Sequence, residues 1–239
     1  MQSGVGEIDA RGKPVFELFE KSPWISLYSR KLDDFPFKLV LAQSTLPVSP
    51  AAAVDAYYGA EENLLEWDKA TMDIQILEEE RNENGVVYER VVRRSVRTPT
   101  PLVSNRDFVY RHSVTMLNDG SFLCIAGSVE HPDAPEEKRF TRGCLHYSCA
   151  LFQVDPNDAN QTRVYNLFLV DPRGLIPPMI VNMAGSKFAD AASDFARYVH
   201  GRNASMELAN GLQPLRRPHP LKEASVMPAQ ANTHVQQHC

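Results

Sequence analysis

Several features are missing from this sequence of 239 residues, and each absence excludes a class of protein. No run of about 20 apolar residues occurs, so we expect no membrane-spanning helix. The net charge of −5 argues against general binding to nucleic acid, which needs a basic surface. The 12 glycines form no GxxxxGK phosphate-binding loop, and the chain contains no Gly-x-Ser-x-Gly hydrolase motif.

We also expect no metal site, lipid anchor or targeting segment. The four cysteines fit neither a zinc-binding nor a CxxC redox spacing, and no other cluster indicates a metal or a cofactor. The first residues show no signal peptide, Gln2 excludes N-myristoylation, and Cys239 lies too close to the end for prenylation. We therefore expect a cytoplasmic protein that contacts membranes only transiently.

Short apolar strands separated by polar turns make up most of the chain. We expect strands at residues 24–30, 37–43, 72–79, 86–96, 108–117, 122–129, 139–154 and 162–170. The Asn-Gly pair at 84–85 and the Asn-Asp-Gly turn at 118–120 predict hairpins. Helices are expected at 14–21, 50–58 and 61–65, the second of them with Ser49 as its cap and Pro50 at its first position.

A long helix is predicted after the last strand. Its apolar stripe consists of Ile180, Ala184, Phe188, Ala191, Phe195 and Val199, and Gly201 is expected to end it. Paired hairpins followed by one such helix predict an α+β domain, with a strongly curved antiparallel sheet packed on the C-terminal helix. We expect a flexible N-terminus at 1–13, one domain at 14–201 and a disordered tail at 202–239.

Five motifs occur in an order and at a spacing that resemble a known family. They are Trp67-Asp68, Ser104-Asn105-Arg106-Asp107-Phe108-Val109, Ser128-Val129-Glu130-His131-Pro132, Arg142-Gly143 and the segment Asp171 to Pro177. Over roughly residues 24–200 the chain resembles the START (StAR-related lipid-transfer) domain family. The resemblance implies a helix-grip fold with an internal tunnel that holds one lipid, such as a phospholipid or a sterol.

The resemblance and the alternation of side chains along strands together give a set of candidate tunnel residues. The set is Trp67, Phe108, Tyr110, His112, Arg142, Cys144, His146, Leu167, Leu169, Met179 and Met183. Because ordinary core residues show the same pattern, packing without ligand contact is the alternative for each apolar member. Arg93 and Arg94 are adjacent, so one of them faces inward, but the sequence does not fix which.

Several positions differ from the members of the family that bind choline lipids. Leu64 stands where the resemblance implies an arginine for the phosphate, and His146 replaces a tyrosine. Met179 and Met183 stand in place of tryptophans of the aromatic cage. Specific binding of phosphatidylcholine is therefore not expected, whereas methionines suit a sterol or variable acyl chains.

The leading hypothesis is a non-enzymatic carrier of one lipid. Its lid would hinge near Gly174 and contact a membrane through Leu175 and Ile176. One alternative is a helix-grip enzyme, similar to a hydrolase or cyclase, with His112 or His146 as general acid or base. A second alternative is a lipid-sensing regulatory module whose tail, 202–239, binds a protein partner.

Overall fold

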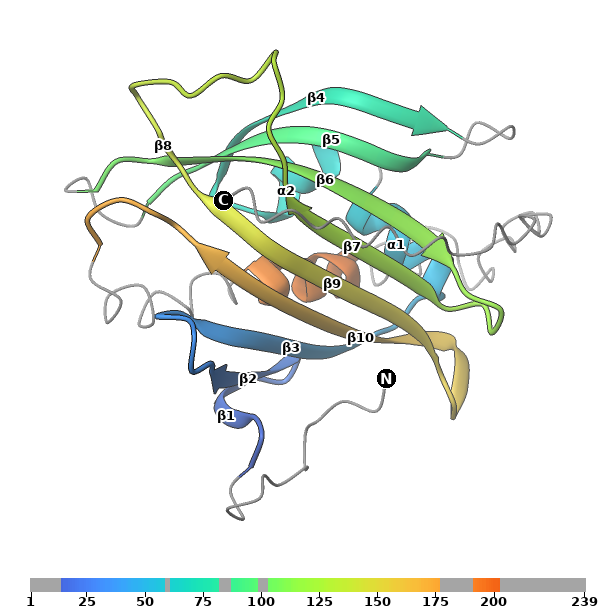
Figure 1. Cartoon of the computed structure of the whole chain (residues 1–239). Helices are drawn as coiled ribbons and strands as arrows, with labels where there is room; N and C mark the ends of the chain where they lie inside the picture. Colours follow the sequence, from blue (N-terminus) through green and yellow to red (C-terminus); the bar gives the residue numbers. More distant parts are fainter. Residues whose placement is uncertain (1–13, 59–60, 82–86, 99–102, 177–190, 203–239) are drawn as a thin grey trace.

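A computed structural model describes residues 14–58, 61–81, 87–98, 103–176 and 191–202. Ten strands form one strongly curved sheet in this part of the chain (Figure 1). The strands are β1 (Glu17–Lys21), β2 (Ile25–Lys31), β3 (Lys38–Leu46), β4 (Thr71–Arg81), β5 (Val87–Val96), β6 (Arg106–Met116), β7 (Phe122–Ser128), β8 (Thr141–Arg142), β9 (Cys144–Asp155) and β10 (Asp158–Asp171). The predicted α+β helix-grip architecture is therefore confirmed.

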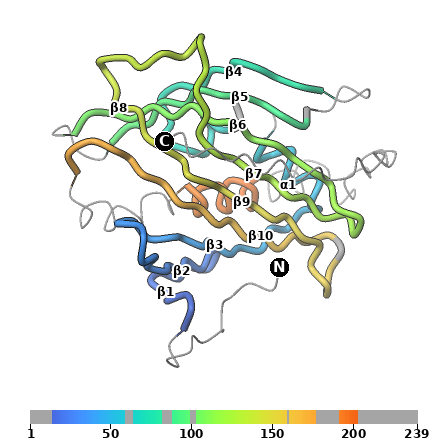
Figure 2. Tube along the Cα trace, viewed as in Figure 1, coloured from blue at the N-terminus to red at the C-terminus, as the bar shows by residue number. Residues whose placement is uncertain are grey.

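The strands follow the order β1-β2-β3-β10-β9-β7-β6-β5-β4, and these neighbours are antiparallel. The two-residue β8 lies off this path and pairs with the start of β6 in parallel. Pairing of β3 with β10, the last strand of the chain, places the N-terminal strands beside the C-terminal strand within one sheet (Figure 2). The sheet thus stays open, with β1 and β4 at its two edges.

In the described part of the chain, three helical segments lie on one face of the sheet: α1 (Pro50–Tyr58), α2 (Glu61–Trp67) and residues 191–202 (Figure 1). At the start of α1, the Ser49 hydroxyl accepts a hydrogen bond from the amide of Ala52 at 3.4 Å, as expected for an N-cap. Pro50 can occupy the first helical position because the amide it lacks would have no helical partner there. No helix among the described residues is long and apolar enough to cross a membrane.

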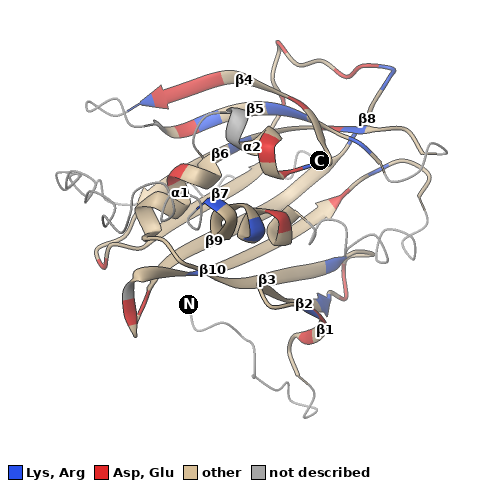
Figure 3. Cartoon of the chain, turned by 180° about the vertical axis from the view of Figure 1, so that it is seen from behind, with Lys and Arg blue, Asp and Glu red and all other residues tan. Residues whose placement is uncertain are grey.

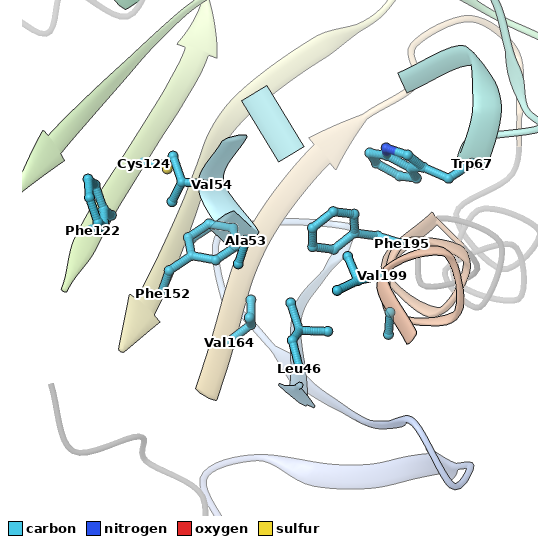
Figure 4. Packing of buried hydrophobic residues seen from close by; sticks show 12 residues of the cluster. Leu46, Ala53, Val54, Trp67, Phe122, Cys124, Phe152, Val164, Phe195 and Val199 are labelled. Atoms are coloured by element: carbon cyan, nitrogen blue, oxygen red, sulfur yellow. The ribbon is translucent and has the colours of Figure 1, made fainter. Parts of the chain in front are cut away.

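The main hydrophobic core lies between this helical layer and the sheet (Figure 4). Phe195 and Val199 of the last helix point toward the sheet and are 3% and 4% exposed. They join Leu46, Phe152 and Val164, which project from three neighbouring strands. The helix is therefore held by burial of its apolar stripe, as its sequence periodicity predicts.

Polar contacts fix the C-terminal end of this helix on two sides. The Tyr198 hydroxyl donates a hydrogen bond of 2.8 Å to a carboxylate oxygen of Glu66 on α2. On the other side, His200 Nε2 lies 3.1 Å from the carbonyl oxygen of Thr45 on β3, and its ring lies 4.4 Å from that of Trp24. This end is consequently anchored to both α2 and the sheet.

Two predictions about local structure are wrong. The segment 14–21 contains the exposed edge strand β1 instead of a helix, because its backbone pairs with β2 from Glu17↔Ser29 to Lys21↔Ser26. A lone short helix would have gained no such pairing, and helices of this length are marginal without packing. Gly201 does not end the last helix, which continues to Arg202. Residues 1–13, 177–190 and 203–239 lie outside the described residues, so the predictions for them are not tested.

The edge strand β4 carries three consecutive glutamates, Glu78 to Glu80, near its end (Figure 3). Charges on an edge strand oppose pairing with a second sheet. The acidic run therefore has a structural explanation at the free edge of the sheet.

Candidate functional site

A cavity of about 310 Å³ lies between the concave face of the sheet and the helical layer. This volume is at the lower end of the range for small-molecule sites. Its walls come from α1, α2, strands β4 to β7, β9 and β10, the turn after β10 and residues 191–192, and most of the lining is apolar. The cavity thus lies between the sheet and the helices, where the helix-grip fold implies a ligand space.

Four of the predicted residues meet in this cavity. Phe108, Tyr110 and His112 line it from alternate positions of β6, and Trp67 lines it from the end of α2. Arg111, between two of them, is exposed on the other face. The inward orientation of this strand is therefore as predicted.

Arg142 and Gly143 affect the cavity indirectly, through their contacts with Asp107 and Phe108. A Cβ atom on Gly143 would lie 2.5 Å from Cζ and 3.0 Å from Cδ1 of the Phe108 ring, so only glycine leaves room for this side chain. Arg142 instead forms two hydrogen bonds with the carboxylate of Asp107, at 3.0 and 2.9 Å. The pair thereby positions Phe108 against the cavity without contributing a side chain to its lining.

Five predicted residues do not line the cavity: Arg142, Cys144, His146, Leu167 and Leu169. On β10 the lining positions are Asn166, Phe168 and Val170, which is the opposite alternation. On β9, Ala150 and Ser148 line the cavity, but Leu145 follows them in place of residue 146. The register of β9 against β10 shifts at this point, because Tyr147 pairs with Leu169 but Leu145 pairs with Val170. The extra residue is a β-bulge, which reverses the facing of the strand beyond it.

The alternatives for Arg93 and Arg94 are resolved. Arg93 pairs with Asp107 and Glu137 on the outer side of the sheet. Arg94 lines the cavity and forms an ion pair with Asp68, whose side chain is 2% exposed. Its Nε also donates a hydrogen bond of 2.7 Å to the Thr71 hydroxyl.

The turn between β10 and the last helix has an unusual backbone. Arg173 and Gly174 both adopt left-handed conformations, with φ of 49° and 77°. Leu175 then projects fully into solvent, whereas Ile176 lines the cavity. The lid residues Met179 and Met183 lie outside the described residues.

One end of the cavity is formed by aromatic and basic residues that the sequence did not single out. Tyr57 and Tyr58 project from the end of α1, and the Tyr58 ring stacks on His112 with 4.4 Å between centroids. The two adjacent tyrosines that end a short apolar helix are the signal that could have indicated them. Arg90 lies at the same end and bonds to Glu79 at 2.6 Å and to the Tyr58 carbonyl at 3.0 Å.

Titratable groups at this end are held in their neutral forms. Burial, assisted by the positive charge of Arg90, lowers the pKa of His112 to about 3. Burial likewise raises the pKa of Tyr57 and the pKa of the Cys124 thiol, each to about 12. Nε2 of His112 is buried and has no hydrogen-bond partner among the described residues. The described part of the chain contains no cluster of three or more side chains that could hold a metal ion.

Comparison with known proteins identifies the family of this domain. The family model of the START domain matches residues 19–200. The chain belongs to the START domain family. Its domain is 31% identical over 146 residues to the mitochondrial steroidogenic acute regulatory protein of Danio rerio, covering 60% of this chain and 48% of that relative.

A relative of more similar length is StAR-related lipid transfer protein 5 of Bos taurus. The two sequences are 24% identical over 200 residues, and the alignment covers 83% of this chain and 87% of the relative. By contrast, this START chain spans about half the length of the steroidogenic acute regulatory proteins that it matches.

Solved structures show the same fold. Human StAR-related lipid transfer protein 5 superposes with a TM-score of 0.68 at 21% identity, covering 79% of this chain and 88% of that one. Human STARD10 superposes with a TM-score of 0.67 at 18% identity, and the superposition covers 82% of this chain and 78% of STARD10. The curved sheet and C-terminal helix described above are thus those of other START domains.

Proposed function

We propose that this START domain carries one lipid, a phospholipid or a sterol, in the cavity between its sheet and its C-terminal helix. The observation that carries this proposal is the apolar cavity between the sheet and the helices, which is lined by Phe108, Tyr110 and Phe168. An apolar chain gains about 0.8 kcal/mol for each CH₂ group that leaves water. The relatives whose names describe lipid transfer support the same function.

The chemistry of the cavity favours a carrier over an enzyme. A general acid or base works best with a pKa near the working pH, but the pKa of His112 lies near 3. Its ring is covered by Tyr58, and His146 lies outside the cavity, where it contacts the ring of Phe35. Leu64 lines the cavity as an apolar side chain, which supports a ligand other than phosphatidylcholine.

Native mass spectrometry of the purified chain, followed by lipid extraction, tests this function. We expect one lipid per chain. Ala126→Phe should abolish binding, because Ala126 lines the cavity, whereas Ile125→Phe on the outer face of the same strand should retain it. A protein that is empty after purification, and stays empty after incubation with mixed liposomes, would contradict the proposal.

The exposed Leu175 is the proposed point of transient membrane contact, on the cytoplasmic side. Two left-handed residues direct this apolar side chain away from the protein, next to a residue that lines the cavity. We expect Leu175→Asp to slow lipid transfer between vesicles several-fold and to leave the amount of bound lipid unchanged. Ile125→Asp, at another exposed apolar position, is the control. Equal transfer rates for Leu175→Asp and wild type would exclude Leu175 as the contact.

A further inference from the structure

Arg106 differs from Arg90 and Arg94, two of the three other arginines that line the same cavity. Arg94 is neutralised by Asp68 and Arg90 by Glu79. Arg106 is 4% exposed, and no carboxylate pairs with it in the described part of the chain. It therefore brings a positive charge to the cavity wall without a counter-charge from these residues.

Neutral backbone carbonyls hold the guanidinium of Arg106 in place. Its Nε donates to the carbonyl of Pro172 at 3.0 Å and its Nη2 to that of Arg173 at 2.9 Å, while Nη1 donates to the carbonyl of Ser104. Carbonyl dipoles satisfy its hydrogen bonds but leave its charge uncompensated. Burial consequently lowers the pKa of Arg106 below its usual value.

A buried cation of this kind is a favourable partner for an anion. Charge-assisted bonds from arginine to a carboxylate or phosphate are roughly twice as strong as bonds between neutral groups, and they form in pairs. An anion in the cavity would also supply the missing counter-charge, which a hydroxyl cannot do. The head group of a lipid is the part of the ligand able to bring such an anion.

The carbonyls that hold Arg106 belong to the turn that leads to the last helix. This turn contains the left-handed residues Arg173 and Gly174, and a Cβ atom on Gly174 would lie 3.1 Å from Arg106 Nη2. The guanidinium and the turn are therefore closely packed. If Arg106 turned toward an anion, the turn would lose two hydrogen bonds.

We propose that Arg106 binds the anionic head group of the carried lipid, a carboxylate or a phosphate, and that this binding loosens the turn at 171–176. The chain of the lipid then runs along β6 from Arg106 toward His112, about 20 Å away at 3.3 Å per residue. This inference rests on the proposed carrier function and narrows its ligand to lipids with an acidic head group.

The first test uses the wild-type chain and two ligands with the same hydrocarbon tail, oleate and oleyl alcohol, at about pH 8, where the carboxylate is ionised. We expect oleate to bind about tenfold more tightly, the effect of one charge-assisted interaction. We also expect hydrogen exchange at 171–176 to become faster with oleate and to stay unchanged with oleyl alcohol.

Two variants complete the test. Arg106→Gln should remove the preference for oleate while retaining the affinity for oleyl alcohol. Arg111→Gln removes a charge from the exposed face of the same strand and should retain the preference. If Arg106→Gln does not fold, the wild-type comparison decides alone.

The outcomes separate this inference from the proposed function. Equal affinities for oleate and oleyl alcohol would overturn the anion site and leave the carrier function standing. Absence of binding by either ligand would overturn the anion site, and the carrier function would fall with it only if the protein also stayed empty after incubation with mixed liposomes. Faster exchange at 171–176 with inorganic phosphate alone, at equal affinities for the two lipids, would assign the site to a free anion and overturn its role in lipid binding.

Discussion

Replacing Gly143 by alanine should disturb both the stability and the cavity of this domain. The added methyl group would overlap the Phe108 ring, since its Cβ would lie 2.5 Å from Cζ and 3.0 Å from Cδ1. Phe108 is 7% exposed and lines the cavity, so its ring has little space other than the cavity itself. Overpacking of this kind typically costs about 1–3 kcal/mol.

Thermal unfolding and lipid uptake measure the two effects. At about 2–4 °C for each kcal/mol in a domain of this size, we expect Gly143→Ala to lower the melting temperature by roughly 2–12 °C. We also expect reduced lipid uptake, because the displaced ring occupies ligand space. Gly127→Ala is the matched control, since a Cβ there would meet only the carbonyl oxygens of His146 and Leu145, at 3.7 and 4.0 Å.

A second substitution tests whether the overlap is the cause. Phe108→Leu removes the ring, so the double variant Gly143→Ala/Phe108→Leu should lose less stability than the sum of the two single variants. For residues in contact, such coupling amounts to about 0.5–3 kcal/mol. A melting temperature of Gly143→Ala equal to wild type, or strictly additive losses, would refute the steric explanation.

Two further predictions concern buried titratable groups. His112, with a pKa near 3 in the folded state, takes up its proton first in the unfolded state, where its pKa is about 6.5. Stability should therefore fall as the pH drops from 6.5 toward 3, at up to about 1.4 kcal/mol per pH unit, and His112→Gln should flatten this slope in urea unfolding. An unchanged slope would contradict the assigned burial. Asp107, with a side chain 1% exposed between Arg93 and Arg142, should tolerate Asn poorly, with a loss of about 3–5 kcal/mol in the free energy of unfolding. Glu137→Gln, at the more exposed end of the same network, should change the free energy of unfolding little. Similar losses for Asp107→Asn and Glu137→Gln would contradict the argument from burial.

The sequence allowed the facing of β6 to be predicted, but not the facing of β9 and β10. On β6 the exposed Arg111 stands between Tyr110 and His112, so polarity distinguishes the two faces. From Leu167 to Val170 all four residues of β10 are apolar, so either alternation is consistent with a buried strand. On β9 the bulge at residue 146 breaks the alternation, and its only evidence is the pairing with β10.

The contacts of Arg106 could not be predicted for a different reason. Two of its three acceptors are backbone carbonyls 66 and 67 positions away in the chain, and every residue possesses such a carbonyl. The ion pair of Arg94 with Asp68 likewise depends on how α2 meets β5, which the spacing along the chain does not specify. The sequence motifs therefore drew attention to particular residues, but the contacts of those residues could be identified only from the structure.

The anchoring of the last helix at Tyr198 and His200 has a consequence for how cargo is exchanged. With this end fastened to Glu66 and to the Thr45 carbonyl, we expect the lipid to enter and leave at the opposite end, by the turn after β10. Loading and unloading would then use the same opening. In that case we expect the protein to leave the donor membrane before it reaches the acceptor. We therefore expect the time spent on each membrane, set by a contact as small as Leu175, to limit how many lipids one copy delivers.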